Sequence, residues 1–319
     1  MFTNQQANSG RIILAPMEGV LDPLLREILT AINPYDYCVT EFIRVTDQRL
    51  TAKAILKLCP ELENNGKTLS GTPVRVQLLG QHPDWMAENA VLVTEMGSPG
   101  VDINFGCPAR RVNQSCGGAA LLKEPETIYQ ILKTVRAALP DEQHLSAKVR
   151  LGWSSPEESY EIIDAVVQSG ANELAIHART KEDGYKANAI KWEWIQTLKP
   201  RISIPLIANG EIWNYADAVA CRQVTGCDDL MVGRGALQLP NLGAVIATNE
   251  SEMPWHEALK LLKRYADMAL ISPKNDYLAA RIKQWLGFLK SQYTEAAHLF
   301  TEIRTLHDTN EFHQRLHQA

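Results

Sequence analysis

The sequence predicts an α/β fold, a closed (β/α)8 TIM barrel followed by a C-terminal all-helical domain. Two observations support this prediction. Between residues 11 and 239, short apolar and β-branched runs alternate with longer amphipathic stretches, as parallel strands alternate with the helices that cover them. Beyond Pro240 the turn signals become few and the pattern is helical to the end. A chain of 319 residues accommodates one barrel and a smaller second domain.

The apolar runs have the length of buried parallel strands. In chain order they are Ile12–Ala15, Tyr37–Glu41, Val74–Leu78, Val101–Asn104, Ser146–Arg150, Leu174–His177, Pro205–Ala208 and Leu230–Gly233. An open doubly wound sheet would instead show a glycine-rich turn after its first strand. Here the first run leads into Pro16-Met17-Glu18-Gly19, so the closed barrel is favoured.

Helical periodicity fills the stretches between the runs and continues after them. It is clearest over residues 125–139 and 161–169, the second of which stops before Gly170. Two further apolar stripes lie in the C-terminal part: Leu259, Leu262, Tyr265 and Ala266, then Ile282, Trp285, Leu286 and Leu289. We therefore expect a helical C-terminal domain.

Composition and the distribution of turn signals divide the chain into three parts. We expect a flexible tail over residues 1–10, a barrel domain over 11–245 and a helical domain over 246–319, joined through a connecting segment at 241–253. The first ten residues lack the apolar run of a signal peptide, and no stretch approaches eighteen apolar residues. A cytoplasmic location without a membrane partner is the expectation.

Charge and cysteine usage limit the kinds of partner. The net charge of −5 does not suggest nucleic-acid binding by the chain as a whole. Residues 254–293, however, hold seven Lys/Arg against three Asp/Glu, a local balance of +4, which is either a basic binding surface or an ordinary solvated helical face. The six cysteines form no C-x-x-C pair and the histidines complete no zinc pattern. We expect a reducing compartment and no metal site.

Polar residues gather where the predicted strands end, which is where such barrels carry their reactive groups. These residues are Glu18, Gln77, Asn104, Cys107, Lys148, Arg150, His177, Arg179, Asn209, Glu211 and Arg234. Packing alone does not explain so many of them on one rim.

The last two strand ends suggest a phosphate site. Asn209-Gly210-Glu211 and Gly233-Arg234-Gly235 supply glycines for close backbone approach, and Arg234 supplies a cation. The alternative is that these glycines only make tight turns. Gln77 could bond the edge of a ring, and Lys148 could balance the negative charge of a reduced isoalloxazine. Together with a phosphate at the last two strand ends, these residues suggest FMN.

Several motifs resemble those of the tRNA-dihydrouridine synthases over nearly all of residues 11–319. They are Pro16-Met17-Glu18-Gly19, Asn104-Phe105-Gly106-Cys107-Pro108, Val112 with Gly117–Leu122, Lys148–Trp153, His177-Ala178-Arg179-Thr180, Ala208–Glu211 and Gly233-Arg234-Gly235. Arg281–Leu286 and Thr40–Arg44 are similar to the C subfamily of the bacterial synthases, which is associated with uridine 16 in the D-loop of tRNA.

The resemblance implies a role for each matching residue. FMN contacts are implied for Pro16, Met17, Glu18, Gln77, Lys148, His177, Asn209, Gly210, Glu211, Gly233 and Arg234. Cys107 matches the catalytic cysteine, Asn104 and Tyr185 match positions facing the substrate, and Arg44, Arg281, Lys283 and Phe288 match positions that orient the tRNA. The family also implies NADPH as the reductant. We expect a monomer, which leaves the barrel mouth open to a bulky substrate.

The reaction of the family explains why these residue types are needed. The flavin delivers hydride to C6 of uracil, and an acid must then protonate C5. A thiol with an ordinary pKa of ~8.5 is mostly protonated at neutrality and can donate. Asn104 can meet the uracil edge with both a donor and an acceptor, and Lys148 or Arg150 can stabilise the developing oxyanion.

Other readings of these residues remain open. Cys107 is alternatively a buried structural thiol or a nucleophile, although no histidine stands in an activating position in the sequence. Cys116 replaces a glycine of the family and is interpreted as a bystander. At the level of the whole chain, the rivals are a small-molecule FMN reductase of the dihydroorotate or dihydropyrimidine type, which would act on free uracil or orotate, and a non-catalytic RNA-binding or folding factor.

Overall fold

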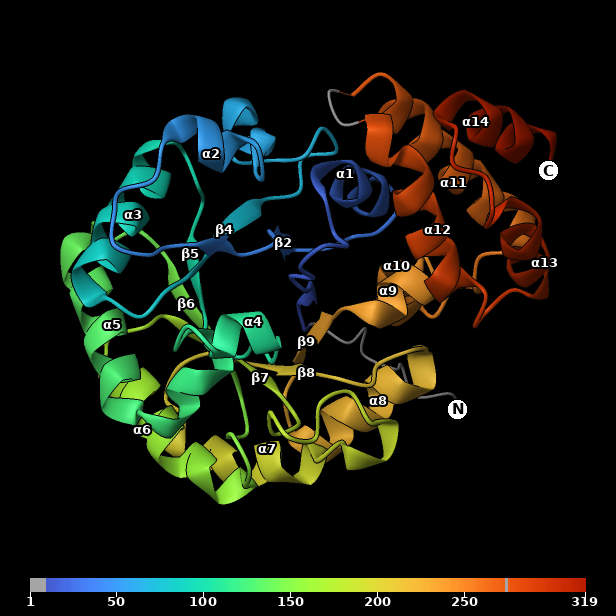
Figure 1. Ribbon diagram of the computed structural model, residues 1–319. Helices are drawn as coiled ribbons and strands as arrows, with labels where there is room; N and C mark the ends of the chain where they lie inside the picture. The colour runs from blue at the N-terminus through green and yellow to red at the C-terminus, as the bar shows by residue number, and fades with distance from the viewer. Residues whose placement is uncertain (1–9, 273–274) are drawn as a thin grey trace.

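Eight parallel strands close into a barrel in the computed structural model, which describes residues 10–272 and 275–319 (Figure 1). They are β1 (Ile12–Leu14), β2 (Tyr37–Val39), β4 (Val74–Leu79), β5 (Val101–Asn104), β6 (Leu145–Arg150), β7 (Glu173–His177), β8 (Leu206–Asn209) and β9 (Asp229–Val232). Pairing of β9 with β1 and of β2 with β4 closes the ring. Every predicted run overlaps one of these strands, and the TIM-barrel prediction is confirmed.

The second predicted run is shorter than expected. After β2 the chain leaves the ladder, and the two-residue strand β3 (Ile43–Arg44) then pairs with the end of β4. Backbone hydrogen bonds bridge the interruption, since the Thr40 amide donates to the Arg75 carbonyl at 3.0 Å. The second barrel strand is therefore made of two pieces.

Helices surround the barrel between successive strands (Figure 1). They are α1 (Pro23–Ala31), α2 (Ala52–Leu56), α3 (Pro83–Glu95), α4 (Arg110–Asn113), α5 (Pro125–Ala138), α6 (Ser159–Gln168), α7 (Trp192–Leu198), α8 (Tyr215–Thr225), α9 (Arg234–Gln238) and α10 (Leu242–Thr248). Short 3-10 turns lie at Pro60–Asn64, Gly118–Lys123, Pro156–Glu158, Ala187–Ala189, Lys199–Arg201 and Asn275–Tyr277. Several starts have clear local causes: the Asp22 side chain accepts from the Leu25 amide at the start of α1, and Pro125 begins α5.

The C-terminal part of the chain is helical, as predicted. It contains α11 (Trp255–Leu270), α12 (Leu278–Leu289), α13 (Thr294–Ile303) and α14 (Thr309–Gln318). These helices pack on one another, while α11 also contacts α1 and α12 contacts α9 of the barrel. The Trp285 indole of α12 donates to the Leu237 carbonyl of α9 at 3.0 Å. In the described residues, no helix combines the length and the apolar character that crossing a membrane requires.

The segment predicted to connect the two parts, 241–253, is itself partly built into the barrel. Helix α10 occupies residues 242–248 and contacts α8, α9 and β1. The side-chain oxygen of Asn33 accepts from the Ala244 amide at 3.0 Å, which ties α10 to the segment that follows α1. The boundary expected between 245 and 246 therefore falls inside a packed helix.

A buried carboxylate holds the amino-terminal end of the barrel together. The Glu173 side chain is 1% exposed and lies 2.6 Å from both Arg75 and Arg11. The Tyr37 hydroxyl donates to it at 2.5 Å. Burial alone raises the pKa of Glu173, but the neighbouring His144, 3.6 Å away, and the charges of Arg75 and Arg11 lower that pKa well below its usual range.

This arrangement predicts acid-sensitive stability. Because the folded-state pKa of Glu173 is depressed, its contribution is complete above the unfolded-state pKa of ~4.3 and is lost as the pH falls through the folded-state value. We expect Glu173→Gln to lower the free energy of unfolding at pH 7 by about 3 kcal/mol. Urea unfolding measured from pH 7 to pH 3 should show a smaller pH dependence in the variant; an unchanged dependence would contradict the assignment.

Candidate active site

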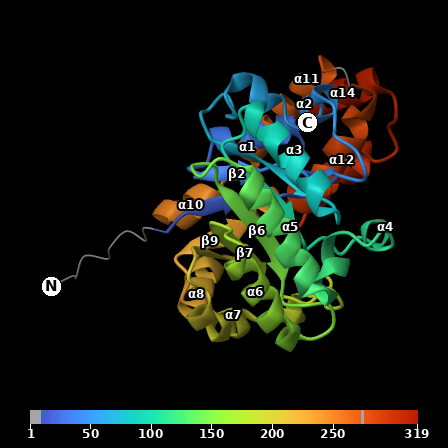
Figure 2. The ribbon, with the colours of Figure 1, turned by 90° about the vertical axis from the view of Figure 1, so that its left-hand side faces the viewer.

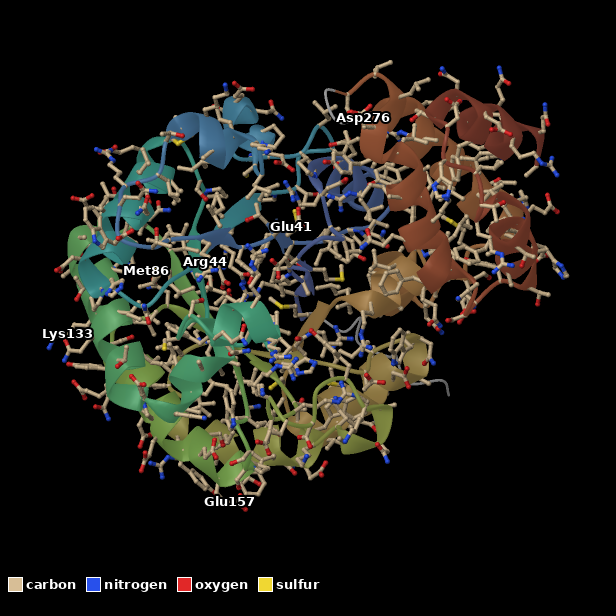
Figure 3. All side chains as sticks on the ribbon, in the orientation of Figure 1. Glu41, Arg44, Met86, Lys133, Glu157 and Asp276 are labelled. Carbon is tan, nitrogen blue, oxygen red and sulfur yellow. The ribbon has the colours of Figure 1, made fainter. Side chains whose placement is uncertain are left out.

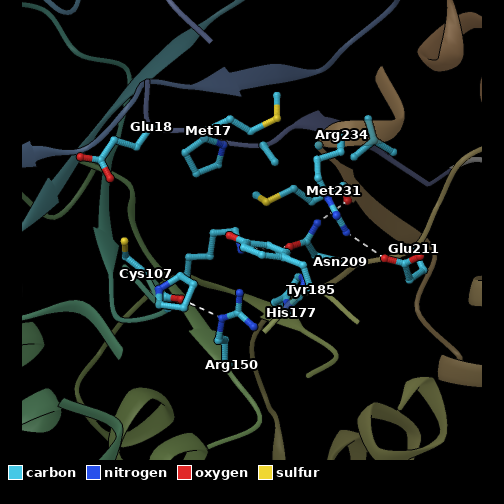
Figure 4. A pocket seen from close by; sticks show the side chains of 18 of the residues that line it. Met17, Glu18, Cys107, Arg150, His177, Tyr185, Asn209, Glu211, Met231 and Arg234 are labelled. Carbon is cyan, nitrogen blue, oxygen red and sulfur yellow. Dashed lines mark hydrogen bonds and ion pairs between the residues drawn. The ribbon is translucent and has the colours of Figure 1, made fainter. Parts of the chain in front are cut away.

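The carboxyl ends of the strands enclose a pocket of about 770 Å³, within the range of small-molecule sites. Its wall comes from the carboxyl-terminal residues of β5, β6, β7, β8 and β9 and from the loops that follow β1, β5, β7, β8 and β9, with Phe288 of α12 completing it. Figure 4 shows Cys107 and Glu18 at one end of the pocket and Arg234 with Glu211 at the other. Helix α4, which follows the Cys107 loop, stands out from the barrel in Figure 2.

Most of the residues predicted to bind the cofactor line this pocket. They are Pro16, Met17, Glu18, Lys148, His177, Asn209, Gly210, Glu211, Gly233 and Arg234. Gln77 does not line it, because its side chain is fully buried. Its amide donates to Asp102 and accepts from Asn104 instead. The structure therefore places Gln77 behind the pocket wall.

Cys107 lies on a loop that the protein fixes from two sides. The Asn104 side-chain oxygen accepts from the amides of Gly106 and Cys107, each at 2.9 Å. Behind the cysteine, Gly118 has a φ of +58°, and a β-carbon there would come within 3.0 Å of the Cys107 carbonyl oxygen. Only glycine fits this position without displacing the loop.

The thiol of Cys107 is kept in its protonated form at neutral pH. Burial raises the pKa of Cys107, and the nearby charge of Glu18 raises it further, while a hydrogen bond with the Ala109 backbone only partly opposes them. The thiol therefore stays protonated around pH 7. This protonation state favours the predicted role as an acid over the nucleophilic alternative.

The structure corrects the predicted role of Asn104 as both donor and acceptor toward a base. Its carbonyl oxygen already accepts two backbone amides, which uses both lone pairs. One hydrogen of its amide goes to Gln77, 2.8 Å away. What Asn104 presents to the pocket is its remaining N–H, a donor only.

Two basic groups line the middle of the pocket. Lys148 donates to the Asn209 side chain at 2.9 Å, and burial followed by the charge of Arg150 lowers the pKa of Lys148 to about 8. Burial and the surrounding cations lower the pKa of His177 well below 6.5, so its ring is neutral at pH 7. The buried His177 Nδ1 has no hydrogen-bond partner within the protein. A buried polar atom of this kind fits a bound ligand.

At the opposite end, the Glu211 side chain is satisfied by the protein. Its carboxylate accepts from Arg179 at 2.7 Å, from Arg234 at 2.9 Å and from the Trp213 indole at 2.8 Å. Glu211 adopts a φ of +54° and Gly210 before it a φ of +119°. With its side chain engaged in this way, Glu211 offers a ligand chiefly its backbone, beside the Arg234 guanidinium.

Arg150 lines the pocket, and its guanidinium also bonds the loops around it; its expected role in stabilising an oxyanion stays a prediction. Its Nε donates to the Gly106 carbonyl at 2.8 Å, and its Nη1 donates to the Thr180 and Gly184 carbonyls at 3.0 and 3.1 Å. It thereby joins the Cys107 loop to the loop that carries Tyr185. No local sequence signal distinguishes this use from a free cation.

The residues predicted to contact tRNA divide into two groups. Asn104, Tyr185 and Phe288 line the pocket, whereas Arg44, Arg281 and Lys283 lie outside it. Arg44 is exposed and bonds the Ser115 hydroxyl; Figure 3 labels it at the end of β3.

Arg281 and Lys283 are also engaged within the protein. Arg281 donates to the Gly19 carbonyl at 2.7 Å, and Lys283 donates to the Leu306 carbonyl at 2.5 Å. Gly19 directly follows the pocket residues Met17 and Glu18, so α12 reaches the pocket wall through Arg281 as well as through Phe288.

The expected absence of a metal stays a prediction. Among the described residues, His313 and His317 of α14 each direct Nε2 to the same oxygen of Asp267, at 2.7 and 3.0 Å. These contacts tie α14 to α11, far along the chain from the pocket residues.

Solved structures of low sequence identity share the barrel. Morphinone reductase (N189A mutant, in complex with tetrahydroNAD) superimposes with a TM-score of 0.53 at 11% identity, covering 76% of this chain and 87% of that one. Histamine dehydrogenase from Rhizobium sp. 4-9 gives 0.55 at 13% identity, covering 86% of this chain and 49% of that one. At such identities the likeness concerns the fold alone.

Sequence relatives are far closer. The tRNA-dihydrouridine(16) synthase of Vibrio vulnificus is 55% identical over 307 residues, covering 96% of both chains. The synthase of the same name from Yersinia pestis is 56% identical over 301 residues, covering 94% of this chain and 96% of that one. The family described as dihydrouridine synthase matches residues 13–319. This chain belongs to the dihydrouridine synthase family.

Proposed function

We propose that the protein is an FMN-dependent enzyme that reduces the C5–C6 double bond of uridine 16 in the D-loop of tRNA, with NADPH as the reductant. One observation supports this chemistry above the others: a protonated thiol, Cys107, in the wall of the same pocket as the neutral His177 and the basic Lys148. The names of the close relatives support position 16 as the target.

The pocket residues fit FMN. The backbone of Gly210 and Glu211 and the segment from Gly233, with the Arg234 guanidinium, suit a phosphate. The unpartnered His177 Nδ1 and the Lys148 ammonium suit polar atoms of the remainder of the cofactor. FMN, once reduced by NADPH, supplies the hydride that C6 of the uracil receives.

The protein's own residues supply the rest of the reaction. As C6 gains hydride, negative charge develops over C5 and O4, and the Cys107 thiol gives its proton to C5. The free N–H of Asn104 stabilises the carbonyl oxygen of the base. The half-exposed Tyr185 ring offers a surface on which the extracted base can stack, which offsets part of the few kcal/mol that unstacking costs.

The substrate is too large for the pocket alone, and we propose that residues 246–319 help to hold it. In this proposal the tRNA contacts Arg44, Arg281, Lys283 and Phe288, and the protein acts as a monomer in the cytoplasm. Such phosphate contacts would make tRNA affinity fall with salt. Arg281 bonds the Gly19 carbonyl. Binding of tRNA to α12 would therefore act on the backbone next to the pocket residues Met17 and Glu18.

The deciding experiment uses unmodified tRNA transcript, the purified protein and NADPH, with dihydrouridine mapped by position. We expect dihydrouridine at position 16. Product at another position would refute the assignment of the uridine and keep the chemistry. Reduction of free uracil or orotate with tRNA unaltered would refute the tRNA function itself.

The pH dependence of the tRNA step follows from the raised pKa of Cys107. The acid form of this thiol is the reactive one, so the rate should stay level through neutrality and fall only well above the ordinary thiol pKa of ~8.5. Stopped-flow reoxidation of the reduced flavin by tRNA, followed from pH 6 to pH 10, measures this fall in rate at alkaline pH. A rate that instead rises with pH would indicate that the thiolate is the active form.

A further inference from the structure

A continuous chain of buried hydrogen bonds runs beneath the pocket and ends at Cys107. Ser146 donates to Asp102 at 2.6 Å, and Gln77 donates to the other oxygen of Asp102 at 2.7 Å. Asn104 then donates to Gln77 at 2.8 Å and accepts from the Cys107 amide at 2.9 Å. Asp102 is 2% exposed and Gln77 is fully buried, so water does not compete for these bonds.

The two ends of this chain fix the orientation of both amides. The carboxylate of Asp102 only accepts, so Gln77 must turn its NH2 group toward it and its carbonyl toward Asn104. The backbone amides of Gly106 and Cys107 only donate, so Asn104 must turn its carbonyl toward them. A reversed Gln77 would face Asp102 oxygen to oxygen.

We infer that Asp102 is a positioning residue for base reduction: through Gln77 it holds Asn104 with an N–H toward the base and keeps the Cys107 loop in place. This inference rests on the proposed function. Neither Asp102 nor Gln77 lines the pocket, and both act through Asn104.

The same orientation bears on which base is accepted. The carbonyl of uracil next to C5, the atom that Cys107 protonates, is O4. Asn104 is bonded to the Cys107 amide, so a base whose C5 meets the Cys107 thiol brings its O4 to the side of Asn104, and in this proposal the free N–H of Asn104 bonds that oxygen. A donor suits O4 of uracil, whereas cytosine carries an amino group there and would meet donor with donor. Asp102 thereby sets a preference for uracil over cytosine.

The test compares Asp102→Leu with Asp102→Asn. Leucine removes the acceptor and leaves Gln77 free to reverse, so we expect reoxidation of the reduced flavin by tRNA to slow at least tenfold. Asparagine still accepts from Gln77 through its side-chain oxygen, and its NH2 group can donate to the Ser146 hydroxyl. The reoxidation rate of this variant should therefore stay within about threefold of wild type. Reduction of the flavin by NADPH needs no contact between Asn104 and the base, so it should change less than twofold in both.

A loss of stability alone is excluded by a matched variant. Thr225→Val removes a buried hydroxyl that bonds the Cys221 carbonyl on α8 at 2.6 Å, outside the pocket. It is expected to lower the unfolding midpoint without slowing either half-reaction. Thermal unfolding of all three variants therefore separates destabilisation from positioning.

A second readout does not depend on the tRNA reaction. In a Cys116→Ser background, alkylation of Cys107 by iodoacetamide is followed by mass spectrometry of its peptide. Asp102→Leu should raise the alkylation rate at least threefold, because the half-buried loop loses its anchor, and Asp102→Asn should not.

The outcomes separate the two proposals. Wild-type protein that makes no dihydrouridine refutes the proposed function, and alkylation still decides whether Asp102 holds the loop. If Asp102→Leu shows the wild-type rates of flavin reoxidation and of Cys107 alkylation, the inference is overturned. Asp102→Asn that is as impaired as Asp102→Leu also overturns it, because the negative charge and not the amide orientation would then matter.

Discussion

Cys107→Ala is expected to accept electrons from NADPH at the wild-type rate and to form dihydrouridine on the order of 10²- to 10⁴-fold more slowly. The side chain lines the pocket next to Glu18, and its raised pKa keeps the proton available at neutral pH. Alanine leaves the loop bonds intact, since these run through the backbone amide and carbonyl of residue 107. The defect should therefore be confined to protonation of C5.

Single-turnover kinetics can test this prediction directly. Reduction of the flavin is followed by its absorbance under anaerobic NADPH, and reoxidation is followed after tRNA is added. Cys116→Ser is the matched control: Cys116 is exposed on the loop that follows α4 and does not line the pocket. If Cys116→Ser lost as much activity as Cys107→Ala, the identification of the acid would be wrong.

The barrel was predictable because its strands have a strong local signal. Buried parallel strands read as short apolar runs, and each of the eight runs overlaps an observed strand. The helical stripes of the C-terminal part were equally local: Leu262, Tyr265, Ile282 and Trp285 are all buried. What the pattern missed was α10, since the Asn- and Glu-containing segment around it resembled a linker.

The positions of the site residues were partly predictable for the same reason. The carboxyl ends of parallel strands meet on one rim, so Cys107, Lys148 and His177 had to lie near each other once the barrel was accepted. Whether a side chain faces the pocket or the layer beneath it was not readable. Strand β4 is buried along most of its length, and nothing in its sequence marks Gln77 as pointing into the layer below Asn104.

Bonding partners were the least predictable feature. Arg281 bonds a carbonyl 262 residues away, and Arg150 bonds three carbonyls from two loops. In the sequence both residues read as free cations that could meet phosphate or an oxyanion. Hydrogen bonds over such separations depend on how helices and loops dock, and periodicity carries no information about that docking.

Arg150→Met is expected to slow the tRNA step about 100-fold and to lower the free energy of unfolding by about 2–3 kcal/mol. Arg150 is 3% exposed, and its loss leaves the carbonyls of Gly106, Thr180 and Gly184 without their donor. The Cys107 loop and the Tyr185 loop would then no longer be held at a fixed separation. Urea unfolding and single-turnover reoxidation measure the two effects separately.

Arg150→Lys decides between positioning and charge. Lysine keeps the positive charge, but its single ammonium group lacks the planar fork that bonds both loops at once. If Arg150 positions the loops, the lysine variant should be nearly as slow as the methionine variant; if its charge stabilised the developing oxyanion, lysine would restore most of the rate. Arg222→Met is the control, because Arg222 is a similarly buried arginine on α8 that bonds the Asp228 carbonyl away from the pocket. It should cost stability and leave the rate unchanged, so a rate loss shared by both arginines would argue against a specific role for Arg150.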